Sequence, residues 1–248
     1  MSGPVALHGG GEFEAGDEAC LSAVLALAAE RGGARPIRIV VVPTAAARSS
    51  PERSGAHGEA AYGRVARRDG LTVEFDVALV VDRASAADPV FAERLAAADI
   101  ISFPGGDPDL IVTVVPGTTA WAAIAGAHAR GAVLVGASAG AMALAAWTWT
   151  PAGGADGLGV VPGLVVVPHA DEASWTSSLE RFGSWAPGGL GLLGVAERTA
   201  AITLDPATDP VAWKVAGEGE VRWLAVHGES PVVLLPGDRF ETPGAARP

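Results

Sequence analysis

Short apolar runs alternate along the first 150 residues with segments whose apolar residues recur at helical spacing. Val5–Leu7 is a short run of this kind, and Ile37–Thr44 is a continuous run rich in β-branched residues. Such continuous runs are typical of strands that are buried on both faces of a parallel sheet. The segments between them read as helices: Glu18–Arg31, Pro51–Arg68, Asp88–Ala98 and Thr118–Gly131. This alternation predicts an α/β fold with a doubly wound, mostly parallel sheet and helices on both faces.

The pattern of apolar runs and helical segments changes after Trp149. A loop leads into the run "LVVVPH", a helical segment follows, and several short strand-like runs then come at hairpin spacing. We interpret these last runs as a C-terminal antiparallel extension of the same domain. Neither an internal repeat nor a long linker is visible. The sequence therefore predicts a single α/β domain over residues 1–248.

Three glycine-rich turns each follow a predicted strand: Gly9–Gly11, Gly105–Gly106 and Gly136–Gly140. In open α/β sheets, ligands bind beyond the carboxyl ends of the parallel strands. We therefore expect the three turns to meet at one edge of the sheet.

Ser138 stands alone in "GASAGA", between an apolar strand and an alanine-rich helix. A strained strand-to-helix turn of this kind can hold a serine Oγ clear of the sheet, with backbone N–H groups aimed at a developing oxyanion. The alternative is a helix-packing site made of small residues, with an incidental serine. The position between strand and helix favours a nucleophile.

A serine nucleophile needs a base to take its proton, and histidine is the usual one. Of the five histidines, His169 ends the run "GLVVVPH", which delivers its side chain to the sheet edge. His57 lies in the polar stretch "SGAHGE", and His128 lies on a predicted helix. We therefore expect His169 to be the base, with a turn residue at the strand end as the alternative.

Composition excludes several function classes. The net charge is −11 and no basic cluster is present, which argues against a nucleic-acid partner. The single cysteine, Cys20, cannot form an internal disulfide and reads as a small core residue. No signal peptide or membrane span is recognised, so we expect a cytoplasmic protein without a membrane partner. No histidine pair has ligand spacing, so we expect neither a metal nor another cofactor.

The stretch "HGGGEF" (His8–Phe13) is similar to the oxyanion motif of lipase-like esterases with an α/β-hydrolase fold. In that fold several strands precede the motif, whereas only seven residues precede it here. We therefore reject that fold.

Five motifs, taken in order, resemble the peptidase E and cyanophycinase family of serine peptidases. They are "GGGE" (Gly9–Glu12), "FPGGDPDLI" (Phe103–Ile111), "GASAGAMAL" (Gly136–Leu144), "GLGVVPGLVVVPHAD" (Gly157–Asp171) and "GVAERTAAI" (Gly194–Ile202). The resemblance implies a flavodoxin-like sheet of the class I glutamine amidotransferase type. Relatives that transfer ammonia from glutamine carry cysteine at the elbow, so serine here argues against that reaction.

The resemblance implies roles for particular residues. Ser138 would be the nucleophile and His169 the base, with the backbone N–H groups of Gly106 and Ala139 as oxyanion donors. The carboxylate that orients His169 would lie in the loop between them, where Asp156 is the candidate. Its rival is Asp171, two residues beyond His169.

Glu12 and Asp107 are expected to line the cleft beside these groups, where Asp107 could equally serve a turn. Asp171 and the acidic residue after it suggest a substrate that bears an amine or another cation.

The sequence departs from the family pattern at two points. Pro108 stands where the family's "GGDQ" loop has glutamine, and the arginines expected to bind an aspartyl carboxylate are missing or displaced. We therefore expect neither aspartyl-dipeptidase nor cyanophycin-degrading activity.

The function predicted is hydrolysis of peptide or isopeptide bonds in small peptides, through an acyl-enzyme on Ser138. A non-catalytic binding protein on the same fold and an esterase remain alternatives. The resemblance also suggests a homodimer.

Overall fold

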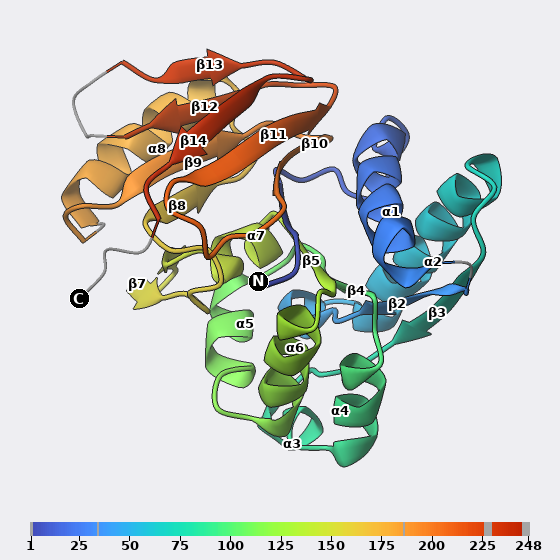
Figure 1. The fold of residues 1–248 in the computed structure, drawn as a ribbon. Helices are drawn as coiled ribbons and strands as arrows, with labels where there is room; N and C mark the ends of the chain where they lie inside the picture. The colour runs from blue at the N-terminus through green and yellow to red at the C-terminus, as the bar shows by residue number, and fades with distance from the viewer. Residues whose placement is uncertain (1, 34, 186, 226–229, 245–248) are drawn as a thin grey trace.

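Residues 2–33, 35–185, 187–225 and 230–244 are described by the structure, a computed structural model. Their strands form two sheets, one of eight strands and one of six (Figure 1). The expectation of a mixed α/β fold with a mostly parallel core is confirmed, whereas the finer flavodoxin-like description stays a prediction.

The eight-stranded sheet has the order β14-β11-β10-β1-β5-β4-β2-β3. The strands β1, β5, β4, β2 and β3 are parallel, and β10, β11 and β14 continue the sheet from β1 in antiparallel pairing. Every residue of β1, β4 and β5 is buried, which explains their continuous apolar runs. The bounds are β1 (Val5–His8), β2 (Ile37–Val41), β3 (Val73–Val77), β4 (Ile100–Phe103), β5 (Val133–Ala137), β10 (Thr199–Thr203), β11 (Val211–Gly217) and β14 (Arg239–Thr242).

Helices cover both faces of this sheet (Figure 1). On one face, α1 (Glu18–Gly32) and α2 (Pro51–Arg68) pack against a cluster that includes Ile39 and Val135. On the other face, a larger cluster around Leu7 and Phe103 packs against the remaining helices of the first 150 residues. These are η1 (Thr44–Ala46), α3 (Arg83–Ala86), α4 (Pro89–Ala96), α5 (Pro108–Val114), α6 (Thr119–Ala129) and α7 (Ala139–Leu144).

The six-stranded sheet has the order β13-β12-β9-β8-β6-β7. Its strands are β6 (Trp147–Thr150), β7 (Gly153–Asp156), β8 (Leu164–Val167), β9 (Gly191–Val195), β12 (Val221–Leu224) and β13 (Val232–Leu234). The helix α8 (Glu172–Trp185) joins β8 to β9, and Trp175 on this helix packs against the sheet.

The sequence predicts an antiparallel extension of the same domain, and the structure divides these strands between two sheets. The strands β10, β11 and β14 do extend the first sheet, but β9, β12 and β13 join β6, β7 and β8 instead. Hairpin spacing along the sequence indicates which runs form strands, but it does not determine which strands they pair with. The segments that follow β5, β8 and β9 carry Ser138, His169 and Glu197. These three residues therefore come from strand ends of both sheets.

Among the described residues, no single helix is long and apolar enough to cross a membrane. The pair α5 and α6 meets the length and composition requirements together, but the two helices are bent by 97° relative to each other.

Candidate active site

Ser138 lies in a sharp turn between the last residue of β5 and the first residue of α7. Its backbone has φ 49° and ψ −110°, a conformation that non-glycine residues rarely adopt. The backbone N–H of Ser138 donates to the carbonyl oxygen of His8 at 2.9 Å, which ties the turn to the end of β1.

The glycines on either side of Ser138 make this turn possible. A Cβ atom on Gly136 would lie 2.5 Å from the carbonyl oxygen of Gly140, and one on Gly140 would lie 2.0 Å from that of Phe103. Real Cβ atoms essentially never approach an oxygen this closely, so a side chain at either position would force the backbone to shift. The elbow that the sequence predicts is present and tightly packed.

His169 reaches Ser138 from the second sheet, two residues after the end of β8. Its Nε2 lies 3.0 Å from Oγ of Ser138, within hydrogen-bonding distance. His169 has φ 52°, and its backbone N–H donates to the carbonyl oxygen of Gly9 at 2.7 Å. A Cβ atom on Gly10 would lie 2.2 Å from Cε1 of His169, so the imidazole packs directly on the Gly9–Gly11 turn.

The carboxylate beside His169 belongs to Glu197, in the turn between β9 and β10. Its Oε1 lies 2.9 Å from Nδ1 of His169. A proton on Nδ1 would be donated to this carboxylate, which leaves Nε2 free to accept the proton of the Ser138 hydroxyl. The side chains of His169 and Glu197 are both about half exposed, at 47% and 50%.

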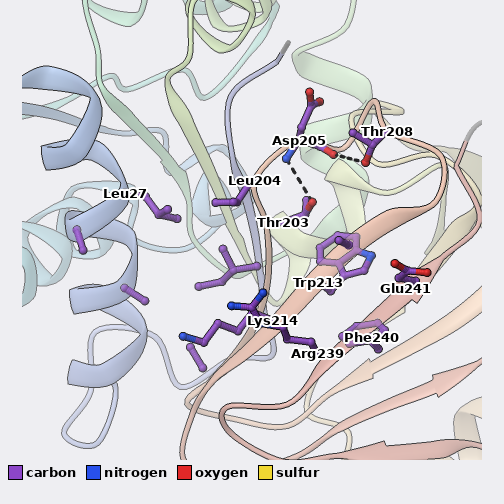
Figure 2. A pocket seen from close by; sticks show the side chains of 15 residues that line it. Leu27, Thr203, Leu204, Asp205, Thr208, Trp213, Lys214, Arg239, Phe240 and Glu241 are labelled. Atoms are coloured by element: carbon purple, nitrogen blue, oxygen red, sulfur yellow. Dashed lines mark hydrogen bonds between the residues drawn. The ribbon is translucent and has the colours of Figure 1, made fainter.

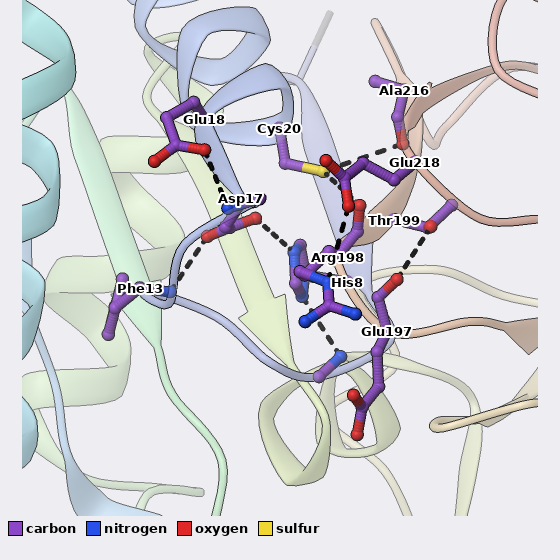
Figure 3. Close-up of polar contacts among 12 residues, drawn as sticks. His8, Phe13, Asp17, Glu18, Cys20, Glu197, Arg198, Thr199, Ala216 and Glu218 are labelled. Carbon is purple, nitrogen blue, oxygen red and sulfur yellow. Dashed lines mark hydrogen bonds and ion pairs between the residues drawn. The ribbon is translucent and has the colours of Figure 1, made fainter.

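The turn that carries Glu197 is fixed by backbone hydrogen bonds. The N–H of Arg198 donates to the carbonyl oxygen of Gly10 at 2.7 Å. The hydroxyl of Thr199 donates to the carbonyl oxygen of Glu197 at 3.0 Å (Figure 3). The Gly9–Gly11 turn therefore holds both the histidine and the carboxylate segment. Of the three glycine turns, this one acts as the support.

The structure does not bring either predicted carboxylate to the side chain of His169. Asp156 is exposed at the end of β7, where it pairs with Trp147, and it forms no hydrogen bond or ion pair with the described His169. Asp171 instead accepts the backbone N–H of Ser174 at 2.7 Å in the first turn of α8, and this bond holds the pKa of its carboxyl below the usual value. Asp156 is predicted from its position between Ser138 and His169 in the sequence, and Glu197 occupies the place at Nδ1 instead.

Sequence reasoning missed Glu197, although a signal for it was available. The residue directly follows the apolar run "GLLGV" and one alanine, as His169 follows its own run. A charged group at a third strand end is the same pattern that pointed to the histidine.

The glycine turn after β4 lies against the nucleophile. A Cβ atom on Gly105 would be 3.2 Å from Cβ of Ser138, and one on Gly106, at φ 144°, would be 2.2 Å from the carbonyl oxygen of Ala45. The backbone N–H groups of Gly106 and Ala139 donate to no acceptor within the described part of the chain. Both are therefore available to a ligand, and their role as oxyanion donors stays a prediction.

Glu12 and Asp107 occupy different surroundings. Oε1 of Glu12 accepts the backbone N–H of Gly105 at 2.7 Å, which places this carboxylate next to the Gly105–Ser138 contact. Asp107 precedes α5 and lies 3.4 Å from Nη1 of Arg48, which also pairs with Asp109 at 3.0 Å. Of the two, only Glu12 is held beside the nucleophile.

His8 performs a structural task at the end of β1 (Figure 3). Its Nδ1 accepts the N–H of Gly10 at 3.1 Å, and its Nε2 lies 2.7 Å from Oδ1 of Asp17, both side chains being buried. The second oxygen of Asp17 accepts the N–H of Phe13 at 2.9 Å. The "HGGG" stretch thus folds on itself through His8 and carries no reactive group.

One buried trio has the residue types of a metal site: His8, Asp17 and Cys20. Both ring nitrogens of His8 already have partners, and burial beside Asp17 raises the pKa of the Cys20 thiol far above its usual range. A metal would need to displace these hydrogen bonds and ionise that thiol. The trio therefore fits a buried hydrogen-bonded cluster and not a metal centre.

Serine hydrolases activate their nucleophile through such a chain of contacts, from hydroxyl to imidazole to carboxylate. The polypeptide belongs to peptidase family S51, and the model of this family matches residues 5–205. This match confirms the resemblance to the peptidase E family, and it supports the general assignment of the protein as a serine peptidase.

Solved structures of peptidases share this fold. A peptidase from an acI-B1 Actinobacterium matches with a TM-score of 0.76 and 26% identity, covering 97% of each chain. A "Putative Peptidase E Protein" from Listeria monocytogenes EGD-e matches with a TM-score of 0.52 and 16% identity, covering 95% of this chain and 99% of that one. At 16% identity, the second likeness shows the fold alone. A search of curated proteins found no significant match.

Proposed function

We propose that the protein hydrolyses amide bonds of small peptides through an acyl-enzyme on Ser138. The observation that carries this proposal is the continuous chain of contacts: Ser138 Oγ to His169 Nε2 at 3.0 Å, and His169 Nδ1 to Glu197 Oε1 at 2.9 Å. In this proposal Glu197 takes the role for which the sequence suggested Asp156.

The reaction begins when Oγ of Ser138 attacks the carbonyl carbon of the substrate and passes its proton to Nε2 of His169. The C–N bond then breaks, and His169 gives this proton to the leaving amine. Water attacks the resulting ester, its proton again goes to Nε2, and the serine hydroxyl is restored as the acid product leaves. Glu197 stabilises the imidazolium formed in each half. The N–H groups of Gly106 and Ala139 would donate to the oxyanion.

The side chains near the nucleophile suggest a substrate that bears an amine. Asp171 is engaged at the start of α8, and the carboxylate of Glu172 pairs with Arg222 at 2.9 Å. Glu12 therefore remains as the acid held next to Ser138, where it would attract a cationic group. Cleavage of basic dipeptides in preference to acidic ones would support this assignment, and the opposite preference would refute it.

Labelling with a fluorophosphonate tests the nucleophile without knowledge of the substrate. The native protein should be labelled at Ser138, and Ser138→Ala should give a folded protein without label. Turnover of a dipeptide library should disappear in the same variant. Labelling at another serine, or undiminished turnover in Ser138→Ala, would refute the proposal.

Two other functions would give different results. An esterase would hydrolyse simple esters but no peptide, and a non-catalytic binding protein would bind peptides and cleave none. Parallel assays of matched ester and amide substrates separate these outcomes from a peptidase.

A further inference from the structure

A cavity of about 730 Å³ lies between α1 and the antiparallel end of the eight-stranded sheet (Figure 2). The helix contributes Ala23, Ala26 and Leu27, and the sheet contributes Ile202 and Leu204. Leu204 is 61% exposed and adds apolar surface to the wall of this cavity. Volumes of this order, roughly 300–1,000 Å³, are typical of small-molecule sites. Ser138, His169 and Glu197 do not line this α1–β11 groove.

Two cations stand side by side in the groove. Lys214 on β11 pairs directly with Arg239 on β14, and their side chains project from the same face of the sheet. Like charges in directly opposed positions are unfavourable unless something compensates them. Neither side chain forms an ion pair with any residue in the described ranges.

The acids that line the groove do not neutralise this pair. Asp205 accepts from the hydroxyl of Ser2 at 2.7 Å and from the N–H of Ala207 at 3.0 Å. Glu241 stands opposite Ala212, two residues beyond Arg239 on β14, and within the described ranges it forms no ion pair with Lys214 or Arg239. Figure 2 shows the nitrogen atoms of Lys214 and Arg239 on the side of α1, with the carboxylates of Asp205 and Glu241 directed elsewhere.

The overall charge of the protein bears on this pair of cations. The chain carries a net charge of −11, and Lys214 is its single lysine among 17 lysines and arginines. Lys214 and Arg239 stand directly opposite each other, and neither has an acid within ion-pair distance among the described residues. An anion bound between the two side chains would supply the missing charge.

We propose that the α1–β11 groove binds an amphipathic carboxylate: a small molecule with a linear apolar tail and one carboxylate, of the kind that medium-chain fatty acids represent. The carboxylate lies between Lys214 and Arg239, and the tail lies along Leu27, Ile202 and Leu204. This site is separate from the catalytic centre, so the proposal does not depend on the proposed peptidase activity.

Amine acetylation tests the position of the headgroup. Lys214 offers the single side-chain amine of the chain, so side-chain acetylation reports this position alone. Acetylation with an N-hydroxysuccinimide ester is followed by mass spectrometry in Ser138→Ala protein, where turnover plays no part. At dodecanoate tenfold above its Kd, acetylation of Lys214 should slow about tenfold, as expected from simple occupancy.

Calorimetric titration tests the chemistry of the ligand. Dodecanoate should bind about fourfold more tightly for each methylene that it has beyond decanoate. Dodecan-1-ol and dodecyltrimethylammonium, with the same tail, should bind much more weakly. All ligands are kept below the concentration at which they form micelles.

Variants locate the site. Lys214→Gln combined with Arg239→Gln should reduce the affinity for dodecanoate to that for dodecan-1-ol. Ala26→Glu, at an exposed position of α1 that lines the groove, should abolish binding. The matched control is Arg53→Gln with Arg67→Gln, two exposed positions of α2, which should retain the native affinity.

Three results would overturn the proposal. The first is unchanged acetylation of Lys214 at saturating dodecanoate. The second is equal affinity of the native protein and the double glutamine variant. The third is a dimer, detected by light scattering, that Ala26→Glu dissociates, because the groove would then be an interface between two copies of the chain.

Discussion

The two ring nitrogens of His169 have different partners, and the partner of Nδ1 selects the tautomer of the imidazole. Oε1 of Glu197, 2.9 Å from Nδ1, can accept only from an Nδ1–H tautomer, and in that tautomer the lone pair of Nε2 faces Oγ of Ser138. Loss of the carboxylate in the comparable arrangement of other serine enzymes lowers kcat by about 10⁴-fold, through the wrong tautomer.

We therefore expect Glu197→Gln to slow fluorophosphonate labelling of Ser138 by roughly 10²- to 10⁴-fold while the fold is retained. Asp156→Asn is the matched control, because Asp156 lies exposed on β7 and should label at the native rate. Equal losses in the two variants would return Asp156 to the role that the sequence suggested.

Cys20 illustrates the opposite case, a reactive residue type that its surroundings make inert. Its side chain is buried, and desolvation together with the nearby charge of Asp17 raises the pKa of the thiol. A disulfide reagent at pH 8 should therefore leave the folded protein unmodified and should modify one thiol per chain in denaturant. Because the chain has a single cysteine, the absorbance of the thiolate released from the reagent measures the modification of Cys20 alone. Rapid modification of the folded protein would contradict the assigned burial.

At the level of elements, the strand-to-helix elbow depends on close backbone contact between β4 and α7. A methyl group on Gly140 would meet the carbonyl oxygen of Phe103 at 2.0 Å. We expect Gly140→Ala to lower the free energy of unfolding by about 1–3 kcal/mol, as overpacking does, and to slow labelling of Ser138 as the elbow moves.

Gly126→Ala is the matched control for the elbow. Gly126 lies within α6, where the added methyl would meet only the flexible end of Arg130 at 3.3 Å. Because alanine is favoured over glycine inside a helix, we expect this variant to gain roughly 0.5–1 kcal/mol. Urea unfolding monitored by circular dichroism measures both variants. The elbow would be shown to be pliable if Gly140→Ala unfolded at the native urea concentration.

The apolar patterns predicted the individual elements better than their partners. The runs before Ser138 and His169 are strands, and both residues follow strand ends as expected. Whether a run forms a strand depends on local features: the residue types, their spacing and the glycines that permit a turn. The pairing of β9 with β8 instead of β10, and hence the position of Glu197, depends on contacts between segments distant in sequence. Spacing along the chain carries no record of those contacts.

On the scale of the whole molecule, the site is assembled from both sheets. β5 supplies the turn of Ser138, whereas β8 and β9 of the second sheet lead to His169 and Glu197. The Gly9–Gly11 turn, which leaves β1, connects the two halves through its carbonyl oxygens. The activity of this arrangement therefore depends on the stability of the entire fold, including its response to pH.

Stability should fall in two stages as the pH decreases. Burial lowers the pKa of His128 on α6 below its ordinary value of 6.5. As the pH falls through 6.5, the unfolded chain takes up a proton that the folded protein resists, so the free energy of unfolding decreases. Asp171 and Asp205 have folded-state pKa values below 3.8, chiefly because they accept hydrogen bonds. Their contribution is present above 3.8 and is lost as the pH falls through their lower folded values.

His128→Gln isolates the first stage. Nδ1 of His128 lies 3.1 Å from the carbonyl oxygen of Ala132, and the amide of glutamine can donate to the same oxygen without titrating. We expect the urea midpoint of the native protein to fall between pH 7.5 and 5.5 more than that of this variant, while both lose stability similarly below pH 4. His57→Gln, on the exposed side of α2, should keep the native profile. Parallel profiles of the native protein and His128→Gln above pH 5 would mean that His128 is solvated in the folded state, because only a histidine kept from its proton can link folding to pH in this range.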